Sequence, residues 1–234
     1  HDASNIAAVI VEPLSGTAGV LPPPVGYLNR LRGICDKHDL LLIFDEVITG
    51  FGRMGSMTGA EEFGVTPDIL TLAKQITNGT IPLGAVVVES ELYDTFMNNG
   101  GPDYMVEFPH GYTYSAHPVA CAAGIAALNV LVDDNLIENV KSMSSKFEAA
   151  VHSLKGSPFV TDIRNYGLSA GISLEHYPGE PLRRPFEVGL KCLEKGFYVR
   201  WGGDTIQLAP PFIVEEKQID DLINAVGESL HEFN

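Results

Sequence analysis

The sequence predicts an α/β fold, in which a mostly parallel sheet carries helices on both faces and a smaller α+β domain follows. Three short apolar runs in the first half each end at an acidic residue, which is typical of strands buried on both faces of a parallel sheet. Between the first two runs, the apolar residues of segment 24–35 recur with helical spacing. With 45% hydrophobic residues among 234, the chain can bury a core.

The expected strands place polar side chains where they end. The runs and the residues that follow them are 7–11 before Glu12, 40–44 before Asp45 and Glu46, and 85–88 before Glu89. A further apolar stretch, 69–73, ends at Lys74. Because ligands of open α/β sheets collect at the carboxyl ends of strands, a site is expected at these residues.

The second half of the chain changes character. Small apolar residues over 116–132 predict a closely packed, buried helix, with Ser115 as its cap and Pro118 in its first turn. Segment 135–154 is more charged and amphipathic, which indicates a second domain. The expected domains are 1–134 and 135–234. The elements expected after residue 154 are strands near 160–164 and 169–174, a helix around 186–195, a hairpin of 197–201 and 205–209, and a terminal helix from 215.

Composition excludes several classes of function. The 30 acidic residues outnumber the 15 lysines and arginines, and a formal net charge of −15 disfavours nucleic acid and anionic membranes as partners. No apolar stretch reaches membrane-spanning length, and the three cysteines are too far apart for a disulfide framework or a zinc site. We therefore expect a cytoplasmic protein without a metal. Since an apolar run begins almost at the first residue, we also expect a piece of a longer chain.

Lys74 is the most unusual candidate for chemistry, since no other lysine or arginine occurs between Arg53 and Lys141. At the end of a buried strand, a lysine loses solvation, which favours its neutral, nucleophilic form. Such amines form Schiff bases with carbonyl compounds. The alternative is an ordinary lysine whose amine reaches solvent, and the spacing alone favours that alternative.

Asp45 favours the Schiff-base interpretation of Lys74 over the alternative of an ordinary lysine. It follows the most apolar strand of the chain, where an ionised carboxylate needs a cationic partner. A protonated pyridine nitrogen, as in pyridoxal phosphate, is such a partner. Val47 is placed to pack on a flat ring, although core packing explains it too. Glu46 should point to the opposite face of the strand, as an ordinary ion pair or cap.

Two further parts of the sequence offer groups that can bind an anion. Hydroxyl groups gather over 110–118, where they can bind phosphate or simply cap a helix. Arg200 is the only cation between Lys195 and Lys217, and it can bind a carboxylate or be a solvated surface arginine.

An apolar strand followed by Asp-Glu also occurs in phosphate-loop ATPases, which is a rival interpretation of Asp45 and Glu46. The chain contains no Gly-Lys pair, however, and an ATPase would leave Lys74 unexplained.

Four motifs together resemble the class III aminotransferases, which are pyridoxal 5'-phosphate enzymes of fold type I. They are Val-Glu-Pro at 11–13, the run 44–53, the segment 67–74, and Thr113 with His117-Pro118. Segments 110–120 and 198–205 are similar to the ω-amino acid–pyruvate (β-alanine–pyruvate) branch of that family. The likeness covers the whole chain. It implies the C-terminal part of such an enzyme, with residues 1–134 as the second half of the cofactor-binding large domain.

The resemblance implies roles for four residues around the cofactor. Lys74 would bind the cofactor covalently and then move the proton of the reaction. Asp45 would pair with the pyridine nitrogen, and Val47 would pack on the ring. Thr113 would hold the cofactor phosphate across a subunit boundary, which implies a homodimer or a homotetramer.

On the substrate side, the resemblance implies that Arg200 binds the substrate carboxylate and that Glu12 lies near the pocket. The implied reaction moves an amino group from an ω-amino acid or a primary amine, such as β-alanine, to pyruvate, giving alanine. Trp201 stands where a smaller aromatic residue is expected, so we expect a narrower pocket. The family's phosphate loop and ring-stacking aromatic residue have no counterpart here, so we expect the isolated chain to be inactive. The alternative is a non-catalytic fragment that contributes half of a shared site.

Overall fold

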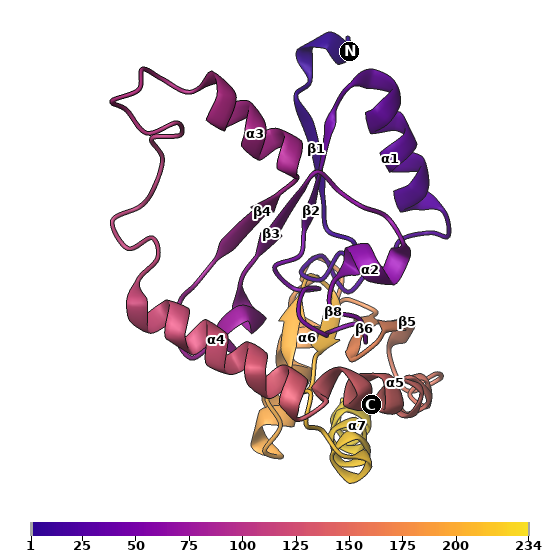
Figure 1. Ribbon diagram of the computed structural model, residues 1–234. Helices are drawn as coiled ribbons and strands as arrows, with labels where there is room; N and C mark the ends of the chain where they lie inside the picture. The colour runs from indigo at the N-terminus through magenta and orange to yellow at the C-terminus, as the bar shows by residue number, and fades with distance from the viewer. Residues whose placement is uncertain (1, 234) are drawn as a thin grey trace.

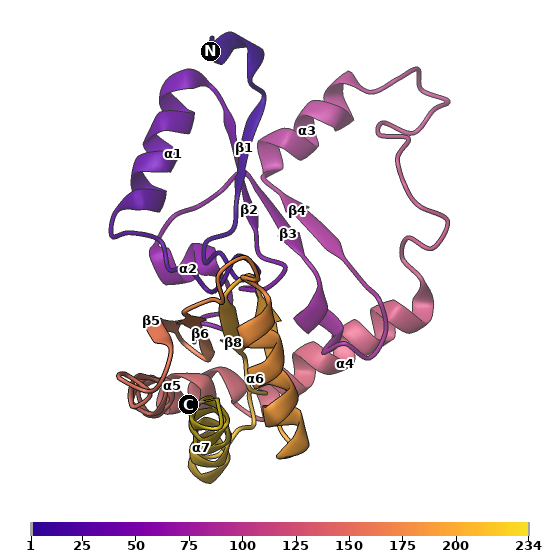
Figure 2. The ribbon, with the colours of Figure 1, turned by 180° about the vertical axis from the view of Figure 1, so that it is seen from behind.

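The computed structural model describes residues 2–233, which form two sheets with helices around them (Figures 1 and 2). The first sheet has four strands in the order β1-β2-β3-β4. Their bounds are Ala8–Val11 for β1, Leu41–Asp45 for β2, Ile69–Leu72 for β3 and Ala85–Val88 for β4. As predicted, β1, β2 and β3 run parallel, so their carboxyl ends lie at one edge of the sheet.

The fourth strand corrects one prediction, because β4 runs antiparallel to β3. The connection between the two contains only the single-turn helix η2 (Lys74–Thr77). A parallel strand requires a crossover connection, usually a full helix, that returns the chain to the other edge. Glu89, which follows β4, therefore lies at the opposite edge of the sheet from Glu12 and Asp45.

The helices cover this sheet unequally. They are α1 (Tyr27–His38), α2 (Gly59–Phe63), α3 (Ser90–Asn99) and α4 (Pro118–Asp133), after a single turn, η1 (Ala3–Asn5). Helix α1 packs on one face of the sheet through a buried cluster made of Leu28, Cys35, Leu40, Leu42, Phe44 and Val65. In both views α3 lies across the strands from α1, and it buries none of its residues (Figures 1 and 2).

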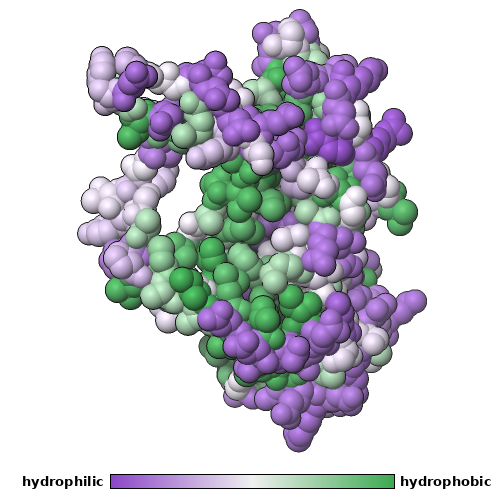
Figure 3. All heavy atoms as spheres, viewed as in Figure 1, coloured by the Kyte–Doolittle hydropathy of each residue, from purple (hydrophilic) through white to green (hydrophobic). Residues whose placement is uncertain are grey.

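Helix α4 is less buried than the sequence predicts. Ala120, Gly124 and Leu131 are buried, but the side chains of Val119 and Ile125 are 61% and 63% exposed. Figure 3 shows hydrophobic side chains gathered on the face between α3 and α4. The expectation that the strands of the first sheet and helix α4 are buried on all sides is therefore wrong for residues 2–233. No element of that range covers the face of β4 and α4 that lies between α3 and α4.

The start of α4 also differs from the prediction. The residue before the helix is His117, which makes no side-chain cap, and the Ser115 hydroxyl instead accepts a hydrogen bond from Tyr112 N at 2.9 Å. Pro118 occupies the first helical position, as predicted, where its missing N–H has no partner to lose.

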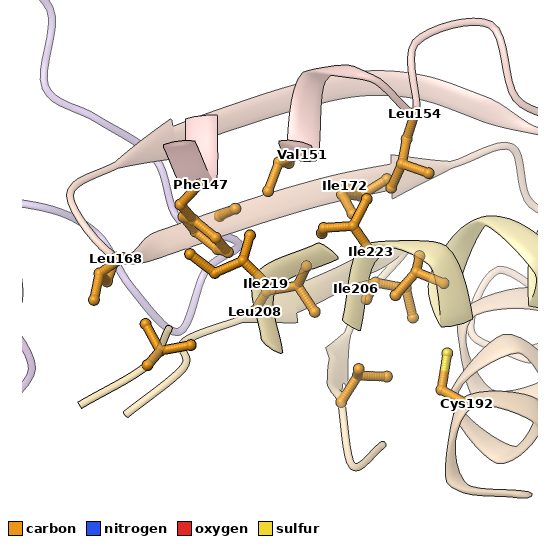
Figure 4. Close-up of a cluster of buried hydrophobic side chains, with 14 of the residues drawn as sticks. Phe147, Val151, Leu154, Leu168, Ile172, Cys192, Ile206, Leu208, Ile219 and Ile223 are labelled. Carbon is orange, nitrogen blue, oxygen red and sulfur yellow. The ribbon is translucent and has the colours of Figure 1, made fainter. Parts of the chain in front are cut away.

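The second sheet is antiparallel, in the order β5-β6-β8-β7, and the expected strands and hairpin are present, although the first hairpin strand covers Arg200–Gly202 and not the expected 197–201. Its elements are α5 (Leu136–His152), β5 (Val160–Tyr166), β6 (Ser169–Leu174), α6 (Arg183–Glu194), β7 (Arg200–Gly202), β8 (Thr205–Leu208) and α7 (Glu216–His231). Figure 4 shows Phe147 of α5, Ile172 of β6 and Ile219 of α7 meeting in the largest buried cluster. This cluster is the core of the C-terminal part.

Helices α4 and α5 meet at residues 134 and 135, where their axes are bent by 61°. The domain boundary that the sequence predicts there stays a prediction. No helix within residues 2–233 is by itself both long and apolar enough to cross a membrane. Helices α4 and α5 would meet that criterion only as a pair joined at their bend.

Asp68 ties three elements of the first half together. Its carboxylate precedes β3, accepts a hydrogen bond from Leu42 N of β2 and pairs with Arg32 Nη1 of α1 at 2.8 Å. Burial opposes ionisation of this carboxyl, but these hydrogen bonds and the charge of Arg32 outweigh it and lower the pKa of Asp68. Arg32 Nε also pairs at 2.7 Å with Asp36, whose side chain is mostly exposed.

We expect Asp68→Asn to lower the free energy of unfolding by about 1–3 kcal/mol at neutral pH, because a charged hydrogen-bond acceptor is lost at a partly buried place. Since the folded pKa of Asp68 is lowered, its contribution is full above the ordinary carboxyl range and is lost as the pH falls through the folded pKa. Urea unfolding between neutral pH and about pH 3 should therefore show a smaller loss of stability in the variant than in the wild type.

Asp36→Asn is the matched control, because it removes the exposed partner of the same arginine, a pair worth only about 0–1 kcal/mol. Equal effects of the two substitutions would contradict the role given to Asp68.

Candidate active site

The ends of two neighbouring strands bring Asp45 and Lys74 to the same edge of the sheet. Asp45 is the last residue of β2 and lies opposite Thr71 of β3 in the parallel register. Lys74 follows β3 by two residues and begins η2. Glu12 follows β1 directly, so three of the residues predicted to form a site come from the carboxyl ends of three parallel strands.

Lys74 has an unusual backbone conformation and borders two cavities. Its φ of +49° lies in the left-handed region, which costs about 1–3 kcal/mol for a residue other than glycine and is common at functional sites. Lys74 lines a cavity of about 600 Å³ together with Arg200, hereafter the Arg200 cavity. It also lines a cavity of about 1320 Å³ together with His110, hereafter the His110 cavity.

The predicted loss of solvation at Lys74 is wrong for the described residues. Its side chain is exposed at the start of η2, where no element of residues 2–233 covers it. What the structure does provide is an amine at the border of two cavities.

The carboxylate of Asp45 is half-buried and only partly engaged. Its Oδ1 accepts a hydrogen bond from Val47 N at 3.1 Å. Within residues 2–233 its other oxygen takes no hydrogen bond, so the carboxylate can accept one more donor. Val47 itself lines the Arg200 cavity beside Lys74.

Both halves of the chain build the Arg200 cavity. Val47, Arg53 and Lys74 come from the first half, and Tyr198 and Arg200 come from the second. Tyr198 and Arg200 are two residues apart, and both line this cavity. The described lining contains three cations and no aspartate or glutamate.

Trp201 does not narrow the Arg200 cavity, contrary to the expectation. It borders a separate groove beside α6, where its ring meets that of Phe186 edge-on at 5.7 Å. Its indole also fills the space above Gly189, where an added Cβ would collide with it. The reason is the alternation of strand β7, which turns Trp201 to the face opposite Arg200.

Glu46 has the capping role that the sequence allowed. Its buried carboxylate accepts hydrogen bonds from Gly59 N and Ala60 N, both at 2.8 Å, and from the Thr49 hydroxyl. These bonds fix the turn after β2 against the start of α2. Glu46 therefore holds the turn on which Asp45 and Val47 depend.

Arg53 is a residue of this site that sequence reasoning missed. It is half-buried, lines the Arg200 cavity, and donates hydrogen bonds to Leu168 O at 3.0 Å and Pro210 O at 2.7 Å. Its guanidinium carbon lies 4.5 Å from the centre of the Phe212 ring. Burial among these groups lowers the pKa of Arg53 to about 10. In the sequence Arg53 is only the last residue of a motif, and no pattern there indicates its partners.

A loop over residues 15–21 forms another wall of the cavity and is held from both sides. Glu12 Oε2 accepts a hydrogen bond from Gly16 N at 2.9 Å, so the side chain of Glu12 holds the start of this loop. From the second sheet, Gln207 Nε2 donates to Thr17 O at 3.0 Å. Arg164 Nε donates to Gly19 O at 2.7 Å. The loop thus joins the end of β1 to strands β5 and β8.

Thr113 is not brought into either cavity. It is exposed in the loop before α4, whereas its neighbours His110, Tyr112 and Tyr114 line the His110 cavity. Within residues 2–233 Thr113 is therefore exposed and lines neither cavity.

The residues of the site fit pyridoxal phosphate chemically. An aldehyde needs an amine, which Lys74 offers at the border of the two cavities. A protonated pyridine nitrogen needs an acceptor, and Asp45 has a carboxylate oxygen that takes no hydrogen bond within residues 2–233. A flat ring needs an apolar contact, which Val47 can give.

Comparison with known proteins agrees with this geometry. Residues 1–230 match the family model described as Aminotransferase class-III. The chain is 60% identical to a β-alanine–pyruvate aminotransferase of Pseudomonas aeruginosa, over 99% of this chain and 52% of that protein. It is 58% identical to an ω-amino acid–pyruvate aminotransferase of Pseudomonas putida, over 100% of this chain and 52% of that protein. The chain thus spans about half the length of these curated relatives.

Solved structures show the same fold. An amine transaminase from an uncultivated Pseudomonas species, in a PLP-bound form, superposes with a TM-score of 0.91 and 37% identity, over 99% of this chain and 53% of that one. An (S)-enantioselective ω-transaminase from Thermomicrobium roseum superposes with a TM-score of 0.91 and 36% identity, over 98% of this chain and 52% of that one.

Two glycine substitutions should have opposite effects if the loop over 15–21 is packed as described. A Cβ at Gly171 of β6 would collide with Gly19 O, so we expect Gly171→Ala to lower the free energy of unfolding by about 1–3 kcal/mol. Nothing lies within 4 Å of a Cβ added at Gly33 of α1, so Gly33→Ala should raise it by about 0.5–1 kcal/mol. Urea unfolding measures both, and a neutral Gly171→Ala would show that the loop does not rest on β6.

Proposed function

The chain belongs to the class III aminotransferase family, and from this premise we propose that the complete protein transfers an amino group to pyruvate. The donor is an ω-amino acid or a primary amine such as β-alanine, and the product is alanine. The observation that carries the proposal is the arrangement of Asp45 and Lys74 at adjoining strand ends, with Arg200 lining the same cavity as Lys74. Two relatives at 60% and 58% identity are named for this kind of reaction.

The proposed cofactor is pyridoxal 5'-phosphate, held by this chain through Lys74, Asp45 and Val47. When bound, it supplies the electron withdrawal that lets a proton leave the carbon carrying the amino group. Lys74 Nζ would hold the cofactor covalently and would also be the base that moves this proton. Asp45 keeps the pyridine nitrogen protonated by accepting its hydrogen bond. Val47 orients the ring by contact with its face.

Arg200 binds the substrate carboxylate in this proposal. A guanidinium offers two parallel N–H donors to a carboxylate, which fixes the orientation of the bound molecule as well as its charge. Arg200 is exposed on the short strand β7 and lines the cavity that Lys74 borders. Glu12 supports the cavity wall indirectly, because its carboxylate is engaged with Gly16 N.

The exposure of Thr113, outside both cavities, is compatible with a site shared between subunits, in which the Thr113 hydroxyl holds the cofactor phosphate of a neighbour. We therefore propose a homodimer or homotetramer for the complete protein. Because the chain spans about half of its relatives, we propose that it is inactive alone and contributes part of each site. The ATPase hypothesis is wrong, because residues 1–230 match the aminotransferase family.

The proposed location is the cytoplasm. All three cysteines are free in the structure, which suits a reducing compartment.

Replacing Lys74 should remove covalent attachment of the cofactor. We expect borohydride reduction of the complete wild-type protein with pyridoxal phosphate to label the peptide that contains residue 74. Lys74→Ala should give no label and no measurable amino transfer, because no other lysine lines either cavity. Lys141→Ala, at an exposed lysine of α5, is the control and should label normally. A label on another peptide of the wild type would refute the assignment.

Replacing Asp45 should slow the reaction without abolishing attachment. In Asp45→Asn the side chain keeps its size but loses its charge, so it no longer holds a proton on the pyridine nitrogen. We expect kcat to fall by about 10²–10³, the usual loss when one electrostatic partner is removed. Glu91→Gln on the surface helix α3 is the control. A kcat within about twofold of the wild type would remove Asp45 from the site.

A further inference from the structure

The Arg200 cavity is lined by positive charges, although the protein as a whole is acidic. The protein has 30 acidic and 15 basic residues, yet the described wall of this cavity contains Arg53, Lys74 and Arg200 and no carboxylate. A concave site lined by one sign of charge and by apolar walls concentrates ligands of the opposite sign. The cavity is therefore built to receive an anion.

The three cations are not equivalent. Lys74 and Arg200 are exposed, and the proposed function already uses both of them. Arg53 is half-buried and held in place by Leu168 O, Pro210 O and the Phe212 ring. These partners are neutral, and no carboxylate of residues 2–233 lies within 4.0 Å of its guanidinium.

Neutral partners leave the charge of Arg53 uncompensated. Two carbonyl oxygens accept hydrogen bonds from Nη1 without cancelling the positive charge, and the half-buried position limits screening by solvent ions. An arginine keeps this charge at any physiological pH. It is also rigid, because two hydrogen bonds and a ring face fix its guanidinium. A rigid, permanent charge at a cavity wall acts on whatever binds there.

We propose that Arg53 is the fixed positive charge that makes the Arg200 cavity prefer carboxylate-bearing substrates over neutral amines. This role deepens the proposed function and rests on it. Arg200 contacts the carboxylate directly, while Arg53 acts as a specificity determinant through its field. The substrate class follows from the chemistry: short molecules with one carboxylate, among both amino donors and keto-acid acceptors.

The test compares propionate with propionamide, which has nearly the same shape but no charge. Isothermal titration calorimetry on the complete protein, without amine or keto acid, measures the Kd of each. We expect Arg53→Gln to raise the Kd of propionate about tenfold, the scale of a Coulomb attraction across a cavity at an effective dielectric constant of about 20. The Kd of propionamide should stay within about twofold, since no charge is involved.

Arg53→Lys is the matched variant, because it also loses the guanidinium fork but keeps the charge. It should bind propionate within about threefold of the wild type, since only geometry has changed. Arg183→Gln is the control for overall charge, because this exposed arginine of α6 does not line the Arg200 cavity. It should bind both compounds as the wild type does. A Kd of propionamide that rises as much as that of propionate would mean a purely structural role and would overturn the proposal.

A second measurement serves if Arg53→Gln does not fold. The amine in Arg53→Lys is half-buried, and burial favours its neutral form as the pH rises. Propionate binding to this variant should therefore weaken at alkaline pH relative to the wild type. Lys74 and Tyr198, the other titrating groups of the described wall, are present in both proteins, and Arg200 stays charged. Identical pH profiles would overturn the proposal.

The outcomes also distinguish a failure of the proposed amino transfer from a failure of the role proposed for Arg53. If the wild type fails to transfer amino groups but its propionate binding depends on the charge at residue 53, the proposed function fails and the anion preference stands. If amino transfer is confirmed but Arg53→Gln binds propionate as the wild type does, only the role of Arg53 is lost.

Discussion

The parallel register between β2 and β3 is the constraint on which the site depends. It sets Asp45 opposite Thr71 and so fixes where the carboxylate stands relative to Lys74, three residues further along. A slip of one residue would turn every side chain of a strand to the other face of the sheet. The register is held where β3 begins, since Asp68 donates from its N–H to Leu42 O at 2.8 Å and accepts from Leu42 N through its carboxylate. The far ends of the strands can therefore carry strained or polar residues.

Around those ends, backbone groups hold the site more often than pairs of charges do. Glu46 accepts from two backbone N–H groups of α2, and Arg53 donates to two carbonyls. Arg164 and Gln207 also donate to carbonyls of the loop over 15–21. A backbone partner satisfies a polar side chain without fixing the identity of another side chain. It also leaves the charge of the arginine in place, which an ion pair would cancel.

The sequence predicted the elements that depend on local pattern. Apolar runs predicted strands β1, β2 and β3, and Asp45 and Lys74 lie at the carboxyl ends of β2 and β3, at the same edge of the sheet. Predictions that needed knowledge of neighbours failed: the direction of β4 and, within residues 2–233, the burial of α4 and the desolvation of Lys74. Periodicity shows which face of an element is apolar, but it does not show what covers that face.

Arg53, the residue that sequence reasoning missed, lies far along the chain from its partners. Arg53 binds a carbonyl 157 residues away, so no local window contains the pair. The burial of Arg53 also explains how an acidic protein can have a cationic cavity. Surface carboxylates act through water, where salt screens them beyond about 8–10 Å. Arg53 acts from a half-buried position at the cavity wall, where screening is weaker. At the place where a substrate binds, a few cations held by the fold therefore outweigh a larger number of acids on the surface.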